Sequence, residues 1–389
     1  MCVNKVASGI LMVAGTAIGA GIWALPVVTA ELGFISSSIL LVVAWLIMWM
    51  SAKMLQLVNG FMPPKANFLG MVHWSLGLWP TVLCWVVYLL LLYVLVAAYL
   101  TGLSDVLSVW SGLSTTSWVA ILGVFSLFFL NNIRITNQVS RYLMYGLFAT
   151  LLVFLVVLSP FLKPYQLKSI QFEGAAKPFT IMLLAFGYQI ILPTLRTYLN
   201  DDRKLSKVIM WGSIMPLVVY LLWNAVLFMT LPKEGMYRLS LLAGMGNPTT
   251  VIPNVLQYVT HNQHIVMMAQ FFSFFTIATS LIGVSQGLVD FLSEGLGYIH
   301  ERLEHVRSLA SICAFVPPMV FAIGYPQGFI MALDYGGQLV AILLLGFPVV
   351  MFWNLLRRGQ LHAAQCRALL LGSLFVMVSA VLLFVGDYF

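Results

Sequence analysis

The chain of 389 residues carries too little charge for a soluble protein of its length. Hydrophobic residues make up 61% of it and charged residues 8%, whereas soluble domains have about 25% charged residues. This composition, with a mean hydropathy of +0.99, excludes a soluble enzyme, a nucleic-acid-binding protein and a disordered scaffold as descriptions of the whole chain. The net charge of +7 fits a membrane protein whose Lys and Arg residues gather on one side.

Runs of about 20 mostly apolar residues, enough to cross a bilayer as a helix, occur along the whole chain. We therefore expect an all-α integral membrane protein with eleven transmembrane helices in a single domain over residues 1–389. The longest connection, 232–262, has room only for a short lid helix. The expected spans are 5–30, 35–58, 80–104, 117–133, 142–162, 178–199, 207–231, 264–292, 308–324, 328–354 and 366–386.

The positions of the 19 Lys and Arg residues orient these spans. With the N-terminus in the cytoplasm, five of them fall on the outer side and the other fourteen on the cytoplasmic side. Such an excess is typical of cytoplasmic loops, so we expect a cytoplasmic N-terminus and, with eleven spans, an outer C-terminus. The five outer residues are Lys163, Lys168, Lys177, Lys233 and Arg238.

The first span contains the sequence GTAIGAG at residues 15–21, followed by Pro26. Each Gly weakens a helix by about 1 kcal/mol, and Pro26 removes a backbone donor. We expect an unwound turn here, because freed backbone groups inside a membrane must be buried in protein or line a cavity. A half-helix N-terminus favours a carboxylate and a C-terminus favours an ammonium or a cation, so an amino acid zwitterion fits both. Close packing through Gly15 and Gly19 is the alternative.

The sixth span has a similar interruption, with Gly187 followed by Tyr188, Gln189 and then Pro193. Interrupted first and sixth spans lie five spans apart, as expected of an inverted repeat with its binding site near the middle of the bilayer. We therefore expect a 5+5 inverted repeat, residues 5–162 and 178–354, with discontinuous helices 1 and 6. Residues 366–386 then form an additional helix.

The eighth span carries a polar face that is a candidate lining of the same site. Ser273, Thr276 and Ser280 recur there at helical spacing, and Thr279 adjoins them. The alternatives are hydroxyl groups that bond back to their own helix and close helix packing through Gly283 and Gly287.

These segments resemble those of the hydroxy/aromatic amino acid permeases, a family of the amino acid–polyamine–organocation superfamily. GTAIGAG with ALP at 24–26 carries the most specific likeness, and AFGYQ at 185–189 with ATSLIGVSQGLVD at 278–290 resemble the family's sixth and eighth spans. The resemblance extends over essentially the whole chain and is strongest to tyrosine-specific members.

The resemblance implies a secondary active transporter, not an enzyme, that imports an aromatic amino acid, above all tyrosine, across the bacterial cytoplasmic membrane by proton symport. It implies that the two turns hold the substrate backbone, that Gln189 reaches a polar group, and that third-span aromatic residues face the substrate side chain. The implied residues are Thr16, Ala17, Gly19, Ala20, Gly21, Tyr88, Tyr93, Phe186, Gly187, Tyr188 and Gln189. The eighth-span face adds Ser273 and Thr276.

The coupling ion is open between a proton and sodium. Ionisable groups inside a membrane are candidates for function; Asp334 lies within the tenth span and Glu31 follows the first. Asp334 becomes only a helix cap if its span begins later, and Glu31 is otherwise an ordinary interfacial carboxylate. Sodium-coupled relatives place adjacent eighth-span hydroxyl groups opposite first-span carbonyls, where Thr279 and Ser280 lie. The fifth span has no Lys before Lys163 to substitute for that ion.

Other functions leave no matching pattern in the sequence. A membrane enzyme needs a nucleophile–base pair, a metal cluster or a carboxylate dyad at one depth, and a channel needs a repeated pore or filter motif. The four Cys and six His residues are scattered, so we expect no metal and no cofactor beyond the coupling ion. The expected partners are an amino acid and the lipid bilayer, without nucleic acid or an obligatory protein partner. Serine or threonine is the alternative substrate in the same fold.

Overall fold

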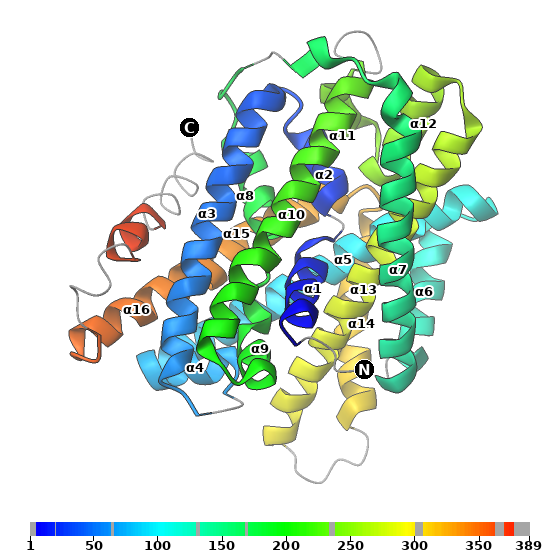
Figure 1. Cartoon of the computed structure of the whole chain (residues 1–389). Coiled ribbons are helices and arrows are strands. Elements are labelled where there is room, and N and C mark those ends of the chain that lie inside the picture. Colours follow the sequence, from blue (N-terminus) through cyan, green and yellow to red (C-terminus); the bar gives the residue numbers. More distant parts are fainter. Residues whose placement is uncertain are drawn as a thin grey trace.

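The structure, a computed structural model, describes residues 5–19, 21–63, 66–129, 133–167, 170–232, 238–299, 306–361 and 369–376. Every regular element in this described part is a helix (Figure 1). The bundle consists of α1 (Lys5–Ala17), α2 (Gly21–Val28), α3 (Gly33–Gly60), α5 (Leu78–Ser111), α6 (Thr115–Phe129), α7 (Ile133–Leu158), α8 (Ala176–Ala185), α9 (Leu192–Leu199), α10 (Asp202–Thr230), α13 (Gln263–Ile299), α14 (Val306–Gly324), α15 (Phe329–Val340) and α16 (Phe347–Arg357).

Shorter elements connect these helices. They are α4 (Phe68–Leu76), η1 (Ser159–Phe161), η2 (Pro164–Leu167), η3 (Gln189–Ile191), η4 (Leu239–Leu241), α11 (Leu242–Met245), α12 (Pro248–Thr260) and η5 (Ala341–Gly346). The last of them is a π-helical turn that joins α15 to α16. The connection 232–262, which has room for a short helix, contains α12. The sequence does not predict α4, because nine residues are too few for a span.

The helices fall where the sequence predicts the spans from 5–30 to 328–354. Among the described residues, 7 helices are long and apolar enough to cross a membrane, or up to 8 when α1 and α2 count as one bent span. Two shorter apolar helices lie at Thr115–Ser126 and Ser308–Gly324. The expected eleventh span, 366–386, lies largely outside the described residues, so the count of eleven stays a prediction.

The interrupted first span lies in the middle of the bundle (Figure 1). Helix α1 packs mainly along α10, and α2 packs against α8. Helix α13, at 37 residues the longest, runs beside them and packs along α5 and α7. Two ends of the bundle can be named from this view: the α4 end, which carries α4 and α9, and the α12 end, which carries α11 and α12.

Arg196 ties the two halves of the chain together at the α4 end. Its guanidinium group donates to the carbonyl oxygens of Asn59, Gly60 (3.2 Å) and Met62 (3.0 Å), at the C-terminus of α3. Carbonyls at a helix C-terminus lack intrahelical partners, and this side chain of α9 adds hydrogen bonds to those at the end of α3 and in the turn that follows it. Arg196 also lies 3.6 Å from the Asp202 carboxylate.

Asp201 caps α10. Its Oδ1 accepts hydrogen bonds from the backbone N–H groups of Arg203 (2.9 Å) and Lys204 (3.1 Å). The bond from the Lys204 backbone, followed by further contacts with Lys204 and Arg203, holds the pKa of Asp201 below its ordinary value. This carboxylate therefore has a structural role at the start of α10.

Candidate functional site

The first-span break, residues 18–20, separates α1 from α2, whose axes differ in direction by 53°. Ile18 is buried, and Gly19 lies against α13: a Cβ atom at Gly19 would be 2.8 Å from the Ser280 Oγ. Ala20 lies outside the described residues. The helix thus breaks within the glycine-rich segment, as the sequence predicts, and Gly19 lets a neighbouring hydroxyl approach the break.

Two expectations for this segment need refinement. Pro26 lies inside α2, several residues beyond the break, so the prediction that it contributes to the interruption is wrong. Close packing, offered as the alternative to a break, occurs together with it: a Cβ atom at Gly15 would overlap Met144 of α7. The glycines therefore serve both purposes.

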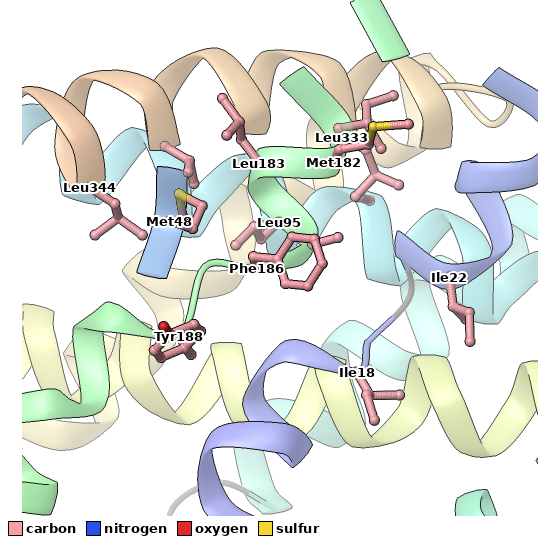
Figure 2. Packing of buried hydrophobic residues seen from close by; sticks show 14 of the residues in the cluster. Ile18, Ile22, Met48, Leu95, Met182, Leu183, Phe186, Tyr188, Leu333 and Leu344 are labelled. Carbon is pink, nitrogen blue, oxygen red and sulfur yellow. The ribbon is translucent and has the colours of Figure 1, made fainter. Parts of the chain in front are cut away.

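The sixth-span break, residues 186–188, separates α8 from η3 and α9. Phe186 and Tyr188 are fully buried, and a Cβ atom at Gly187 would lie 3.0 Å from the Leu184 carbonyl oxygen. Figure 2 shows both breaks together, with Ile18 in the first and Phe186 and Tyr188 in the second. Pro193 lies in the first turn of α9, where its missing N–H has no helical partner to lose.

Gln189 fixes the chain immediately after the sixth-span break. Its Nε2 donates to the Met48 carbonyl oxygen of α3 at 2.9 Å. The side chain is fully buried, and no described residue donates to its Oε1. A buried acceptor of this kind is costly unless a ligand or water pairs with it, so Gln189 combines an anchoring bond with an available acceptor.

Tyr220 of α10 connects the two breaks. Its hydroxyl group lies 2.5 Å from the Ala17 carbonyl oxygen and 3.0 Å from the Ala185 carbonyl oxygen. Ala17 is the last residue of α1 and Ala185 the last residue of α8. The carbonyl ends of two half-helices therefore converge on one buried hydroxyl, and the electronegative ends of both helix dipoles meet there.

The other first-span candidates for substrate binding take different positions relative to the Tyr220 hydroxyl. Gly21, the first residue of α2, packs against α8: a Cβ atom there would lie 3.7 Å from the Ala185 Cβ. Ala17 is buried and presents its carbonyl to Tyr220. Thr16 is exposed, and its hydroxyl donates to the Met12 carbonyl of its own helix at 2.8 Å, which leaves its side chain outside the convergence of the two breaks.

The two third-span tyrosines take different positions. The Tyr88 ring packs edge-on against Phe291 of α13, with 4.8 Å between the ring centroids. The Tyr93 hydroxyl donates to the Cys313 carbonyl of α14 at 2.9 Å. Tyr93 thus joins α5 to α14 rather than to either break.

A cavity of about 470 Å³ opens between α5, α9 and α13 near the α4 end. Ile190 and Ile191, which follow Gln189 after the sixth-span break, form part of its wall. Its lining includes Asn67, Phe68, Tyr88, Ile190, Ile191 and Asp290. Tyr88 therefore lines the same cavity as Ile190 and Ile191, which lie shortly after the sixth-span break.

The α12 end is closed by an aromatic cluster of Trp23, Phe154, Trp223 and Phe272, from α2, α7, α10 and α13. All four side chains are fully buried. The Trp23 and Trp223 ring centroids lie 5.0 Å apart, and each lies within 5.4 Å of Phe272. Because Trp23 lies just beyond the first-span break, this cluster packs the α12 side of the site while the cavity opens on the other.

The eighth-span hydroxyl groups bond mainly to backbone. Ser273 donates to the Thr249 carbonyl of α12 at 3.0 Å, and Thr276 donates to the Phe272 carbonyl of its own helix at 2.6 Å. Thr279 and Ser280 both donate to the Thr276 carbonyl at 2.9 Å. Of these four, Ser280 lies against Gly19 of the first-span break.

The two candidate carboxylates differ in their surroundings. Asp334 lies in the second turn of α15, not at its start, and its Oδ1 accepts a 2.7 Å bond from Thr180 of α8. Asp334 is therefore no helix cap, and it touches the half-helix that ends at the sixth-span break. Glu31 is exposed in the turn between α2 and α3, away from both breaks.

Sequence reasoning did not single out Tyr220 or the aromatic cluster. Tyr220 lies in an otherwise ordinary apolar helix, and its importance comes from a neighbour 203 positions away in the chain. Aromatic residues are also frequent throughout the chain, at 13%. No local pattern marks these residues, since only the tertiary fold brings them to the breaks.

Comparison with known proteins gives one family across the chain. A model of the tryptophan/tyrosine permease family matches residues 3–386. The tyrosine-specific transport system 2 of Haemophilus influenzae is 29% identical over 383 residues, which cover 91% of this chain and 89% of that protein. The tryptophan-specific transport protein of Pseudomonas aeruginosa is 25% identical over 357 residues, which cover 88% and 84%.

Among solved structures, a mutant manganese transporter of Eremococcus coleocola has a similar fold. The TM-score is 0.64 at 15% sequence identity, covering 97% of this chain and 85% of that one. At this identity the likeness concerns the fold alone.

Proposed function

The chain belongs to the tryptophan/tyrosine permease family, and from that premise we propose that it imports tyrosine across the bacterial cytoplasmic membrane by proton symport. The protein is a multi-pass membrane transporter for aromatic amino acids rather than an enzyme, as its family and relatives are. The observation that carries the proposal is the convergence of two half-helix ends, Ala17 and Ala185, on the Tyr220 hydroxyl.

The α-ammonium of the substrate binds at this convergence. Carbonyl oxygens at helix C-termini lack intrahelical partners and carry partial negative charge, which suits an ammonium with three N–H donors. The α-carboxylate binds at the N-terminus of α2, where backbone N–H groups point along the helix axis. Phe186, Gly187 and Tyr188 shape the opposite wall, so the zwitterion lies between the breaks.

The aromatic side chain of the substrate extends toward the cavity that Tyr88 and Ile190 line. The Gln189 Oε1, which no described residue satisfies, is the acceptor for a polar group such as the tyrosine phenol. Serine or threonine is the alternative substrate, and its small side chain would not extend into the cavity that Tyr88 and Ile190 line.

The proposed architecture has eleven spans, with residues 5–162 and 178–354 as inverted repeats and 366–386 as an additional helix. The N-terminus is cytoplasmic and the C-terminus lies outside, in agreement with the distribution of Lys and Arg. In this orientation the cavity opens to the cytoplasm and the aromatic cluster closes the outer side.

Asp334 is the proposed proton carrier, because it is an ionisable group within a span and contacts α8 through Thr180. Sodium is the second candidate, and the position of Ser280 beside Gly19 favours it. The Ser280 and Thr279 oxygens would then face carbonyls freed at the first-span break.

Transport of labelled tyrosine into proteoliposomes tests these proposals. A pH gradient and a sodium gradient are imposed separately, with tryptophan, phenylalanine and serine as competitors. We expect uptake driven by the pH gradient and blocked only by the aromatic amino acids. Uptake driven by sodium alone would move the coupling site to Ser280, and transport of serine without tyrosine would contradict the substrate.

A further inference from the structure

Tyr220 lies where a substrate ammonium would have to bind. Its hydroxyl oxygen is within hydrogen-bond distance of both the Ala17 and the Ala185 carbonyl oxygens, at 2.5 Å and 3.0 Å. An ammonium that bonds to the same two carbonyls must displace this hydroxyl or share its place. The protein thus supplies its own hydrogen-bond donor at a point where the substrate supplies a stronger one.

We infer that Tyr220 replaces the substrate ammonium during the step in which the unloaded transporter returns across the membrane. The inference rests on the proposed function, in which the ammonium bonds to Ala17 and Ala185. A symporter that accumulates substrate must reorient without it after each delivery. In that step the two buried carbonyl ends still need a donor, and Tyr220 provides it.

The chemistry of the hydroxyl group suits a temporary replacement. A tyrosine hydroxyl carries one hydrogen, so one of the two carbonyls receives most of the bond at any moment. An ammonium carries three hydrogens and a charge, and charge-assisted bonds are about twice as strong as neutral ones. The substrate ammonium therefore displaces the hydroxyl from the Ala17 and Ala185 carbonyls when it binds, and the hydroxyl bonds to them again when the substrate leaves.

Packing keeps the hydroxyl near both carbonyls. The Tyr220 side chain is fully buried, and its ring packs edge-on against Phe186 of the sixth-span break, with centroids 5.4 Å apart. Gly21 packs against Ala185 on the other side of the site. The Tyr220 ring therefore packs against Phe186, the residue that follows Ala185, whose carbonyl oxygen accepts the hydrogen bond from the Tyr220 hydroxyl.

This role separates two modes of transport. Exchange of internal for external tyrosine uses only the loaded transporter, whereas net uptake also needs the unloaded return step. Without the hydroxyl, that step loses the one hydrogen bond that the two buried carbonyls share, at a cost equivalent to about a tenfold or larger change in an equilibrium constant. Removal of the hydroxyl should thus slow net uptake and spare exchange.

The test compares Tyr220→Phe with the wild type in proteoliposomes that contain or lack internal tyrosine. We expect net uptake to fall roughly tenfold and exchange to stay within about twofold of the wild type. The affinity for tyrosine, measured by binding in detergent, should hold or rise because the competing donor is gone. Thr230→Val is the matched control, because it removes a buried hydroxyl bond to Val226 on the same helix, away from both breaks.

A rescue variant keeps the test decisive if Tyr220→Phe does not fold. Tyr220→4-aminophenylalanine restores N–H donors without the hydroxyl and should restore net uptake. Equal loss of exchange and net uptake in Tyr220→Phe, or net uptake lost but exchange kept in the rescue variant, would overturn the inference. A wild type that exchanges no aromatic amino acid would instead refute the proposed function, and this inference with it.

Discussion

The two helix breaks lie next to each other in the fold, but different kinds of residues define them. The first-span break contains a glycine, Gly19, and its environment is defined by a neighbour that approaches closely, the Ser280 hydroxyl. The sixth-span break contains bulky buried residues, Phe186 and Tyr188, and is held from outside by the Gln189 bond to Met48. One break therefore depends on missing side chains and the other on particular side chains and bonds.

The difference also separates the two candidates for the coupling ion. Ser280 lies against the first-span break, whereas Asp334 contacts α8, the half-helix that ends at the sixth-span break. A sodium ion would thus act on one broken helix and a proton on the other. Variants at each break can distinguish the two cases.

The largest effect is expected from Leu substitutions at the break glycines. Gly19→Leu would drive a side chain into Ser280, and Gly187→Leu would drive one against the Leu184 backbone oxygen. Overpacking costs about 1–3 kcal/mol, so either change should lower tyrosine uptake by up to roughly a hundredfold. Uptake is measured at equal amounts of reconstituted protein.

Gly283→Ala is the control for both glycine variants, because nothing lies within 4 Å of a Cβ atom at that position. It should transport like the wild type. Normal transport by both Leu variants would rule out the two breaks as the substrate site.

Asp334→Asn should abolish accumulation against a gradient while it spares exchange. The amide oxygen can still accept the bond from Thr180, but the side chain no longer carries a proton. The measurement compares uptake driven by a pH gradient with tyrosine exchange at equal pH. Thr180→Val removes the bond and keeps the carboxylate, so it should retain pH-driven accumulation; an Asn variant that accumulates normally would exclude Asp334 as the proton carrier.

Gln189→Leu should have a smaller effect, a roughly tenfold loss in apparent affinity for tyrosine. The change removes the bond to Met48 and the available acceptor, and one buried hydrogen bond contributes about 0.5–1.5 kcal/mol. Concentration-dependent uptake gives the apparent affinity for tyrosine and for phenylalanine. If Gln189 binds the phenol, phenylalanine should be affected less than tyrosine; an equal loss for both would restrict Gln189 to anchoring.

The smallest effect is expected from Ser280→Ala combined with Thr279→Val. Both hydroxyl groups already bond to their own helix, and a proton-coupled transporter has no further use for them. Uptake driven by a pH gradient should stay within about twofold of the wild type, since such bonds contribute little to helix stability. Complete loss of uptake, together with sodium dependence in the wild type, would favour the sodium site.

The contrast between the breaks also explains which features of the fold the sequence predicts. The first-span break is visible as GTAIGAG, because glycines weaken a helix wherever they occur. The apolar runs predict the helices from 5–30 to 328–354, because the length of a span is a local property. Even so, Pro26 looked like part of the interruption and lies instead within α2.

The sixth-span break was harder to read because it depends on partners far away in the chain. Gly187 and Pro193 indicate it, but the bond from Gln189 to Met48 spans 141 positions and the one from Tyr220 to Ala185 spans 35. Tyr88 and Tyr93 looked equivalent in sequence, yet one lines the cavity and the other bonds to Cys313. Residues whose role arises from tertiary contacts leave no local pattern.

Photo-crosslinking tests the central claim, that the substrate lies between the two breaks, most directly. A labelled tyrosine analogue with a diazirine on its side chain is bound to the purified protein, activated by light, and its sites of attachment are mapped by mass spectrometry. We predict attachment within residues 183–191 and at Tyr88, blocked by excess tyrosine. Tyrosine-sensitive attachment confined to Tyr93 of α5 and Cys313 of α14, with none at the sixth-span break, would contradict the account.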